Sequence, residues 1–261
     1  MTLADDLAFA RSLADTADGI SLDRFRAADL HVDLKADHTH VTDADQAVEA
    51  ALRDRIAEER PGDTFLGEET TAAAGGTAAS EGRRQWIVDP IDGTANYLRG
   101  VPVWASLIAL AVDGVPQVGV VSAPALGKRW WAGAGLGAAS FDGPLQVSRV
   151  RDLADASVSY NSLQGWDVDG RLEALLRLSR SVWRTRAYGD MWSYMMVAEG
   201  VVDVAGEPDL KPWDMAALVP IVEEAGGRFT SLEGEPGPWH GTALATNGVL
   251  HDAVVRALAG D

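Results

Sequence analysis

A short apolar segment of this chain runs straight into a turn that carries two acids. Residues 86–88 (WIV) have the character of a buried strand, and residues 89–94 (DPIDGT) follow directly. Pro90 fixes the turn and Gly93 opens the backbone, so the Asp89 and Asp92 carboxylates can point at one spot. Hard cations such as Mg²⁺ take oxygen ligands of this kind. The segment predicts a sheet that ends at an acidic edge, although an isolated motif of this type is also typical of an ordinary Asx turn.

Two more acidic segments occupy comparable places in the pattern. Glu68 and Glu69 come directly after Gly67 and a short predicted strand at 64–66, and Asp214 stands at the predicted start of a helix. Adjacent glutamates are usually only a solvated surface, and an aspartate at a helix start usually caps free amides. All three segments nevertheless lie at strand ends or helix starts, and the two glutamates lie at what would be the same edge of the sheet as Asp89 and Asp92.

The N-terminal half combines helices with an antiparallel sheet. Apolar residues at helical spacing predict a first helix from Leu3 to about Phe25, and a capping box of Thr42 and Asp45 predicts a second that ends at Pro61. Apolar runs separated by a typical hairpin turn at 113–114 predict antiparallel strands. These strands are expected at 103–112 and 117–121, with the pattern continuing through Trp130-Trp131 and Phe141. Segment 35–40 is expected to be polar and mobile, and segment 70–82 to be a surface loop.

The C-terminal half alternates between strands and helices. Helices are predicted from residue 170, at 191–199 and at 215–225, and strands at 157–160, 182–186, 201–205 and around 229 and 244. Mixed sheets covered by helices are the expected outcome, which is a mixed α/β (α+β) fold. A boundary near residue 150 is expected to separate the two halves.

Composition excludes several functions. Lysine and arginine number 22 and aspartate and glutamate 39, so the formal net charge is −17, and no nucleic acid is expected as a partner because binding its backbone requires basic residues. Cysteine is absent, which excludes disulfides and zinc–thiolate sites. Residues 1–10 lack a signal-peptide pattern and no apolar run is long enough for a membrane span, so a cytoplasmic protein with no membrane partner is expected. Such an acidic chain would repel phosphate esters unless divalent cations supplied positive charge.

Read together, three segments resemble the inositol monophosphatase family in order and spacing: GEE at 67–69, WIVDPIDGT at 86–94 and WDMAALVPIVEEAGG at 213–227. The likeness spans essentially the whole chain. Within the family, RGVPVWASLIAL at 99–110 and RAYGD at 186–190 are most similar to actinobacterial histidinol-phosphate phosphatases. The resemblance implies a five-layer αβαβα sandwich of the inositol monophosphatase and fructose-1,6-bisphosphatase type. Half 1–150 would bind metal and phosphate, and half 151–261 would determine the substrate and complete the active site.

The resemblance also implies two to three Mg²⁺ ions. Glu68, Asp89 and the Ile91 carbonyl would hold the first, and Asp89, Asp92 and Asp214 would hold the second. A third, weaker ion would depend on Glu68 and waters. Multiple cations would turn an acidic cleft into a site that attracts anions.

The family mechanism would be hydrolysis by a metal-activated water, without a covalent enzyme intermediate. Glu68 and Thr94 would activate the water, and Asp45 would accept from the threonine hydroxyl. The amides of Gly93 and Thr94, at a predicted helix start, would bind the phosphate. Lys35 matches a loop lysine that family members carry near the active site, although a solvated surface lysine is an equal alternative.

Substrate choice would fall to the C-terminal half. Asp190 and Glu207 match substrate-pocket positions of the family, and Arg186 in the same RAYGD segment is a further candidate contact. Two acids suit a cationic alcohol, so the resemblance favours histidinol phosphate, with its amine and imidazole, as the substrate. The alternatives are an inositol-1-phosphate phosphatase or a phosphatase of broad specificity. Asp190 could instead only cap the helix that follows it.

One position of the chain departs from the family pattern. Ala95 stands after DGT, where the related histidinol-phosphate enzymes favour lysine, and this loss of a cation beside the phosphate weakens the substrate assignment. The family implies a homodimer. A binding protein that keeps the fold without turnover is a further alternative, and the presence of all four carboxylates and Thr94 argues against it.

Overall fold

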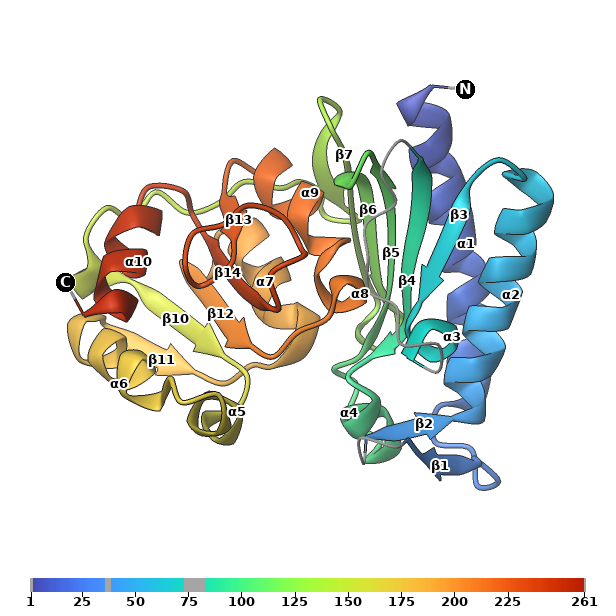
Figure 1. Ribbon diagram of the computed structural model, residues 1–261, viewed down its shortest axis with the longest axis horizontal. Helices are drawn as coiled ribbons and strands as arrows, with labels where there is room; N and C mark the ends of the chain where they lie inside the picture. Colours follow the sequence, from blue (N-terminus) through green and yellow to red (C-terminus); the bar gives the residue numbers. More distant parts are fainter. Residues whose placement is uncertain (1, 36–38, 73–82, 261) are drawn as a thin grey trace.

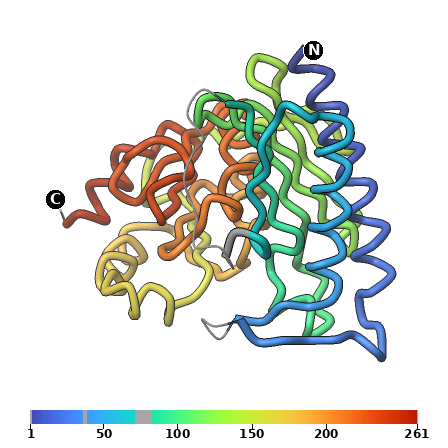
Figure 2. The backbone as a smooth tube through the Cα atoms, turned by 45° about the vertical axis from the view of Figure 1, so that its right-hand side comes forward, coloured from blue at the N-terminus to red at the C-terminus, as the bar shows by residue number. Residues whose placement is uncertain are grey.

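The computed structural model describes residues 2–35, 39–72 and 83–260 and consists of five layers (Figure 1). Helices α1 and α2 cover one face of a seven-stranded sheet, and helices α7 to α9 lie between this sheet and a five-stranded one. Helices α5, α6 and α10 cover the outer face of the second sheet. Figure 2 shows from another angle that α1 and α2 lie side by side on the same sheet face. The predicted αβαβα sandwich is therefore confirmed.

The first sheet uses strands that follow one another in the chain. Strands β3 and β4 are parallel and every later neighbour pair is antiparallel. In spatial order the strands are β3 (Thr64–Gly67), β4 (Arg84–Asp92), β5 (Ala105–Val112), β6 (Val115–Ala123), β7 (Lys128–Gly133), β8 (Gly137–Ser140) and β9 (Gly143–Pro144). The helices of this half are α1 (Leu3–Arg24), α2 (Asp43–Glu59), α3 (Glu68–Ala72) and α4 (Thr94–Leu98), with the short helix η1 (Pro124–Leu126) and a hairpin of β1 (Val32–Leu34) and β2 (His40–Thr42).

The second sheet is mixed. Strand β10 pairs in parallel with β11 and β12, and β14 pairs antiparallel with β12 and β13. In spatial order the strands are β11 (Arg184–Arg186), β10 (Ser157–Tyr160), β12 (Val204–Pro208), β14 (Thr242–Thr246) and β13 (Arg228–Thr230). The helices are η2 (Leu153–Asp155), α5 (Leu163–Val168), α6 (Leu172–Ser181), α7 (Asp190–Ala198), α8 (Pro212–Met215), α9 (Leu218–Glu224) and α10 (His251–Ala259).

Alternate residues of the first sheet face two different helix layers. Trp86 and Val88 of β4 pack with α1 and α2, whereas Ile87 between them belongs to the core that contains α7 and α9. A period of two with apolar residues on both faces is what a sheet buried on both sides requires. Each such side chain stabilises the fold by about 1.5–3 kcal/mol when fully buried. None of the helices in the described ranges is both long and apolar enough to cross a membrane.

Strand β4 leaves regular pairing where its two acids lie. It advances three residues from Asp89 to Asp92 while β5 advances two, from Leu107 to Ala105, so β4 contains a bulge. Side chains three positions apart on a regular strand point to opposite faces. The extra residue turns Asp92 back to the side of Asp89, and Pro90 has no N–H to leave unpaired in the bulge. The bulge therefore brings the two carboxylates together.

Several predicted boundaries are wrong for identifiable reasons. The predicted helix 215–225 begins later, as α9 at Leu218, and Met215 instead ends the separate helix α8, because Pro220 has no N–H to continue a helix from α8 and occupies the first turn of α9. The predicted strand 201–205 begins later, at Val204, because the amides of Val201 and Val202 donate to the Met196 carbonyl and close the end of α7.

Other elements were not predicted at all. Helices α5 and α10 and the β1–β2 hairpin are absent from the sequence prediction, and the hairpin lies at the ends of the segment expected to be mobile, with the Lys35 amide donating to the Thr39 carbonyl. Residues 36–38 lie outside the described residues. The predicted loop 70–82 begins within α3, and its remainder, 73–82, also lies outside the described residues. Phe141, predicted in the antiparallel pattern, lies between β8 and β9, where its ring contacts Trp131.

Candidate active site

Three carboxylates from both halves of the chain meet between the sheets. Asp89 and Asp92 end β4 and Asp214 lies in α8, and one oxygen of each lies within 4.8 Å of the others. The bulge in β4 directs the first two acids, and α8 packs against β4 and brings the third. The convergence expected from sequence is present for these three residues.

The electrostatics of this group favour a bound cation. Asp89 is 3% exposed, and its Oδ1 has no hydrogen-bond partner among the described residues. Burial raises the pKa of Asp89 well above its usual value, and the charges of Glu68, Asp92 and Asp214 raise it further. Burial likewise raises the pKa of Asp214 to about 7. Because buried like charges are costly without a counter-charge, an unpaired oxygen among clustered carboxylates fits a hard divalent cation such as Mg²⁺.

Backbone amides hold two of these carboxylates in place. Asp92 Oδ2 accepts from the Met191 amide at 2.8 Å, and Asp214 Oδ2 accepts from the Lys211 amide at 2.7 Å. Asp92 thus caps the start of α7, and Asp214 closes the first turn of α8. Asp214 is thus not the N-cap that sequence reasoning allowed but the third residue of α8, which accepts the amide of the N-cap residue Lys211.

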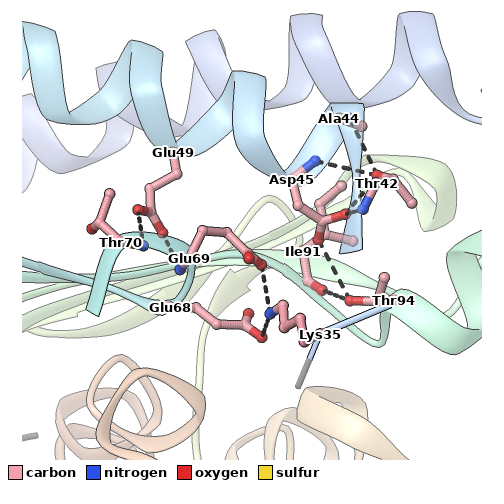
Figure 3. A network of polar contacts seen from close by, with 10 residues as sticks. All are labelled: Lys35, Thr42, Ala44, Asp45, Glu49, Glu68, Glu69, Thr70, Ile91 and Thr94. Carbon is pink, nitrogen blue, oxygen red and sulfur yellow. Dashed lines mark hydrogen bonds and ion pairs between the residues drawn. The ribbon is translucent and has the colours of Figure 1, made fainter. Parts of the chain in front are cut away.

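Glu68 faces the same space from the other side, as the first residue of α3. Its charge raises the pKa of both Asp89 and Asp214, although it lies outside the group of three. Figure 3 shows its carboxylate bound by Lys35, whose Nζ lies 2.7 Å from Glu68 Oε1 and 2.8 Å from Glu69 Oε1. Burial lowers the pKa of Lys35, but the two glutamates more than offset this, so the net change is upward. Lys35 therefore supplies a positive charge at the edge of the acidic cluster.

Thr94 and Asp45 lie beside the bulge. The Thr94 hydroxyl is 3.0 Å from the Ile91 carbonyl and 3.5 Å from Asp45 Oδ1, so its better hydrogen bond is to the carbonyl (Figure 3). Asp45 is fully buried, and burial raises its pKa to about 6, while hydrogen bonds from Thr42 act in the opposite direction. The backbone of Gly93 has a φ of 85°, which an L side chain rarely adopts, and it starts α4 at Thr94.

A second acidic pair adjoins the cluster. Asp190 directly precedes Met191, whose amide binds Asp92, and the charges of Asp190 and Glu207 both raise the pKa of Asp92. Asn96 Nδ2 donates to Asp190 Oδ2 at 2.7 Å, and Asn161 Nδ2 donates to Glu207 Oε1. Burial raises the pKa of Asp190 to about 6 and that of Glu207 to about 8. Each of these carboxylates is therefore held by one amide in a partly desolvated place.

Asp190 does not act as the cap of α7 that sequence reasoning allowed. Asp92 accepts the Met191 amide instead, and the Asp190 carboxylate contacts Asn96. Asp190 also has a φ of 49°, a left-handed conformation that aspartate and asparagine tolerate better than most residues. The hydrogen bond from Asn96 of α4 therefore fixes the Asp190 carboxylate, rather than a contact within α7.

Two positions singled out from the sequence, Arg186 and Ala95, are exposed. Arg186 is exposed at the end of β11, and its Nη1 donates to the Thr185 carbonyl at 2.7 Å. Within residues 2–35, 39–72 and 83–260, no hydrogen bond or ion pair joins it to the acidic cluster. Ala95 is the second residue of α4 and is exposed, so the missing lysine side chain leaves no gap in the core.

Sequence reasoning missed two residues that orient others in the site. Asn96 follows the DGT segment closely and could have been noticed for that reason, but its partner is 94 residues away. Glu49 is a buried acid within the apolar stripe of α2, beside Val48 and Leu52. A charged residue on the buried face of a helix is a signal that a polar partner exists.

Comparisons with known proteins place the chain in a family. The model of the Inositol monophosphatase family matches residues 3–260. A Histidinol-phosphatase of Mycobacterium tuberculosis is 57% identical over 259 residues, covering 97% of this chain and 98% of that protein. A Histidinol-phosphatase of Streptomyces coelicolor is 55% identical, covering 97% of each. The solved inositol monophosphatase of Zymomonas mobilis superposes with a TM-score of 0.86 at 31% identity, covering 99% of each chain. This chain belongs to the inositol monophosphatase family.

Proposed function

We propose that the chain is a Mg²⁺-dependent phosphatase that hydrolyses histidinol phosphate to histidinol and phosphate. The observation that carries the proposal is the second acidic pair, Asp190 and Glu207, next to the carboxylate cluster. The cluster suits metal ions, and the pair suits an alcohol that carries positive charge, as histidinol does with its amine and imidazole. Two relatives that are more than half identical to the chain bear the name Histidinol-phosphatase.

Glu68, Asp89, Asp92, Asp214 and the Ile91 carbonyl are the proposed ligands of two to three Mg²⁺ ions. Bound cations would offset the repulsion between the carboxylates and the phosphate and would make a water molecule more acidic. Support comes from the proximity of three of these carboxylates and from the charge of Glu68 acting on two of them. Lys35, which contacts Glu68, would adjust its position when the metal site fills.

The remaining catalytic roles fall to groups near the bulge. We propose that Glu68 and Thr94 orient the attacking water and that Glu68 takes its proton. Asp45, whose Oδ1 lies 3.5 Å from the Thr94 hydroxyl, would accept a hydrogen bond from that hydroxyl. The amides of Gly93 and Thr94 would bind phosphate oxygens, and the left-handed backbone of Gly93 supports a tight turn at this point. Half 1–150 would thus perform the chemistry common to the family.

Half 151–261 would determine the substrate through Asp190 and Glu207. Asn96 and Asn161 support this assignment because each donates to one of the two carboxylates. Arg186 stays a weaker candidate, since its side chain is exposed. The homodimer and the cytoplasmic location stay predictions.

A substrate panel at fixed Mg²⁺ tests the proposal. The purified protein should release phosphate from histidinol phosphate with a kcat/KM much higher than from inositol 1-phosphate, and chelation of the metal should stop both reactions. Similar or reversed ratios would overturn the substrate and favour an inositol or broad-specificity phosphatase. Full activity after exhaustive chelation would overturn the metal assignment.

A further inference from the structure

A buried carboxylate outside the proposed ligand set caps the helix that carries Glu68. Glu49 of α2 is 1% exposed. Its Oε2 accepts from the Glu69 amide at 2.7 Å and its Oε1 accepts from the Thr70 amide at 2.8 Å (Figure 3). Both oxygens of one side chain are thus engaged with the first turn of α3.

The first turn of α3 needs such a partner. The initial amides of a helix have no carbonyl four residues earlier to bind, and a side chain at the preceding position usually supplies the acceptor. Here that position is Gly67, which has no side chain. A Cβ at Gly67 would lie 2.5 Å from Cδ of Glu49 and 2.6 Å from its Oε2. The glycine therefore makes the space through which Glu49 reaches the two amides.

Glu49 also connects α3 to the other side of the site. Asp45 and Glu49 are four residues apart on α2, and both are buried, so they point the same way one turn apart. Asp45 faces Thr94, whereas Glu49 holds α3 (Figure 3). One rigid helix thereby sets the spacing between Thr94 and the turn that starts at Glu68.

We propose that Glu49 is a positioning residue for the metal site. By fixing the amides of Glu69 and Thr70, it sets the direction in which the Glu68 carboxylate leaves α3. The inference rests on the proposed function, in which Glu68 is a metal ligand. Partners that orient metal ligands typically change metal affinity or activity by roughly 10- to 100-fold when they are replaced.

The test replaces the acceptor without changing its shape. In Glu49→Gln the amide group can accept from one backbone N–H, but its NH₂ faces the other, so one hydrogen bond is lost. Glu58→Gln, at an exposed position of the same helix, is the matched control, and Glu68→Gln is the reference for a lost ligand. Binding of Mg²⁺ alone is measured by calorimetry, and hydrogen exchange is measured at the Glu69 and Thr70 amides.

We expect Glu49→Gln to raise the Kd for Mg²⁺ roughly 10-fold or more, to speed exchange at both amides, and to recover most of its kcat at saturating Mg²⁺. Glu58→Gln should match the wild type. Gly67→Ala, which pushes Glu49 away by a different route, should repeat the effect on metal affinity and serves if Glu49→Gln does not fold.

The failures are distinguishable. If Glu49→Gln lowers only the melting temperature and binds Mg²⁺ as Glu58→Gln does, Glu49 has a structural role and the inference is overturned. If Glu68→Gln itself binds Mg²⁺ like the wild type, the proposed ligand set is wrong and the inference fails with it.

Discussion

The two halves of the molecule supply acids to one site in different ways. Asp89 and Asp92 come from a single strand of nine residues, and their convergence needs only one bulge. Asp190 and Glu207 come from α7 and β12, and each accepts from a distant amide: Asn96 lies 94 residues from Asp190, and Asn161 lies 46 residues from Glu207. The difference teaches that the convergence of Asp89 and Asp92 is encoded within one strand, whereas the placement of the pair proposed to select the substrate depends on tertiary contacts. Four experiments can break or sharpen this contrast.

The largest effect is expected at the local acids. Asp92→Asn removes a proposed ligand charge but keeps an oxygen that can accept the Met191 amide, so α7 should still form. Loss of several kcal/mol of transition-state stabilisation corresponds to a fall in kcat of roughly 10³-fold. Phosphate release and Mg²⁺ calorimetry measure it, with Asp54→Asn, 76% exposed on α2, as the control. Retained activity would show that the metals lie elsewhere.

A smaller and selective effect is expected in the second half. Asp190→Asn keeps a residue that tolerates the φ of 49° but removes the charge proposed to face the cationic alcohol. We expect KM for histidinol phosphate to rise roughly 10- to 100-fold, since hydrogen bonds to charged groups are worth about 1.5–3 kcal/mol. The rate on p-nitrophenyl phosphate, whose alcohol portion is uncharged, should change little, as should both rates in the exposed-site control Asp155→Asn. Equal losses on both esters would assign Asp190 to the common chemistry and erase the contrast between the halves.

The second half also contains a pH-sensitive group away from the site. His251 is fully buried, and its ring nitrogens lie 3.0 Å from the Thr230 and Thr246 hydroxyls. Burial lowers its pKa from 6.5 to about 4. As the pH falls, the unfolded state therefore binds a proton at His251 at a higher pH than the folded state does. The contribution of His251 to the free energy of unfolding is fully present above pH 6.5 and is lost as the pH drops toward 4.

Between pH 7.5 and pH 5 this group should remove about 2 kcal/mol from the free energy of unfolding. Urea unfolding of the wild type and His251→Gln at both pH values measures the difference, and His240→Gln, at an exposed position, is the control. The pH-dependent loss should shrink in His251→Gln alone. An unchanged loss would mean that other groups account for the acid sensitivity.

The smallest effect is expected at Ala95, the position of the first half that departs from the family pattern. Ala95→Lys places a cation on the exposed face of α4, near the proposed phosphate site. Exposed charge pairs are worth about 0.2–1 kcal/mol, so KM should fall by no more than roughly fivefold, on esters of cationic and of uncharged alcohols alike. Ala95→Gln has a similar length without the charge and should leave KM unchanged. A gain restricted to histidinol phosphate would place selectivity in the first half as well.

The fold was predictable where its signals are local. The capping box of α2 is present, with the Thr42 amide donating to Asp45 Oδ2 and the Asp45 amide donating to Thr42 Oγ1. The hairpin at Asp113-Gly114 follows from two residues that tolerate positive φ, and both adopt it. The β1–β2 hairpin, with strands of three residues, carries too short a pattern to be read from sequence. Its existence depends on tertiary contacts.

The sequence named candidate residues for the site but not their geometry. The three clustered acids and Glu68 were named by their match to the family's motifs, and the structure brings the three together. The supports were missed, since Glu49 acts on amides 20 and 21 residues away and Asn96 on a still more distant carboxylate. Such contacts leave no periodicity in the sequence. The exposure of Arg186 likewise depends on where β11 ends, which local pattern does not specify.

The unequal advance of β4 and β5 imposes a rule of parity on the stretch between the two acids. Side chains along a strand alternate like odd and even numbers, and the bulge makes an odd separation behave as an even one. Deleting one residue between Asp89 and Asp92 would remove the bulge and leave a regular separation of two, so the two carboxylates would still share a face. Inserting one residue while the bulge remains would send one carboxylate toward the helices α1 and α2. The number of residues between the two acids therefore decides whether their side chains share a face, more than the identity of Pro90 or Ile91 does.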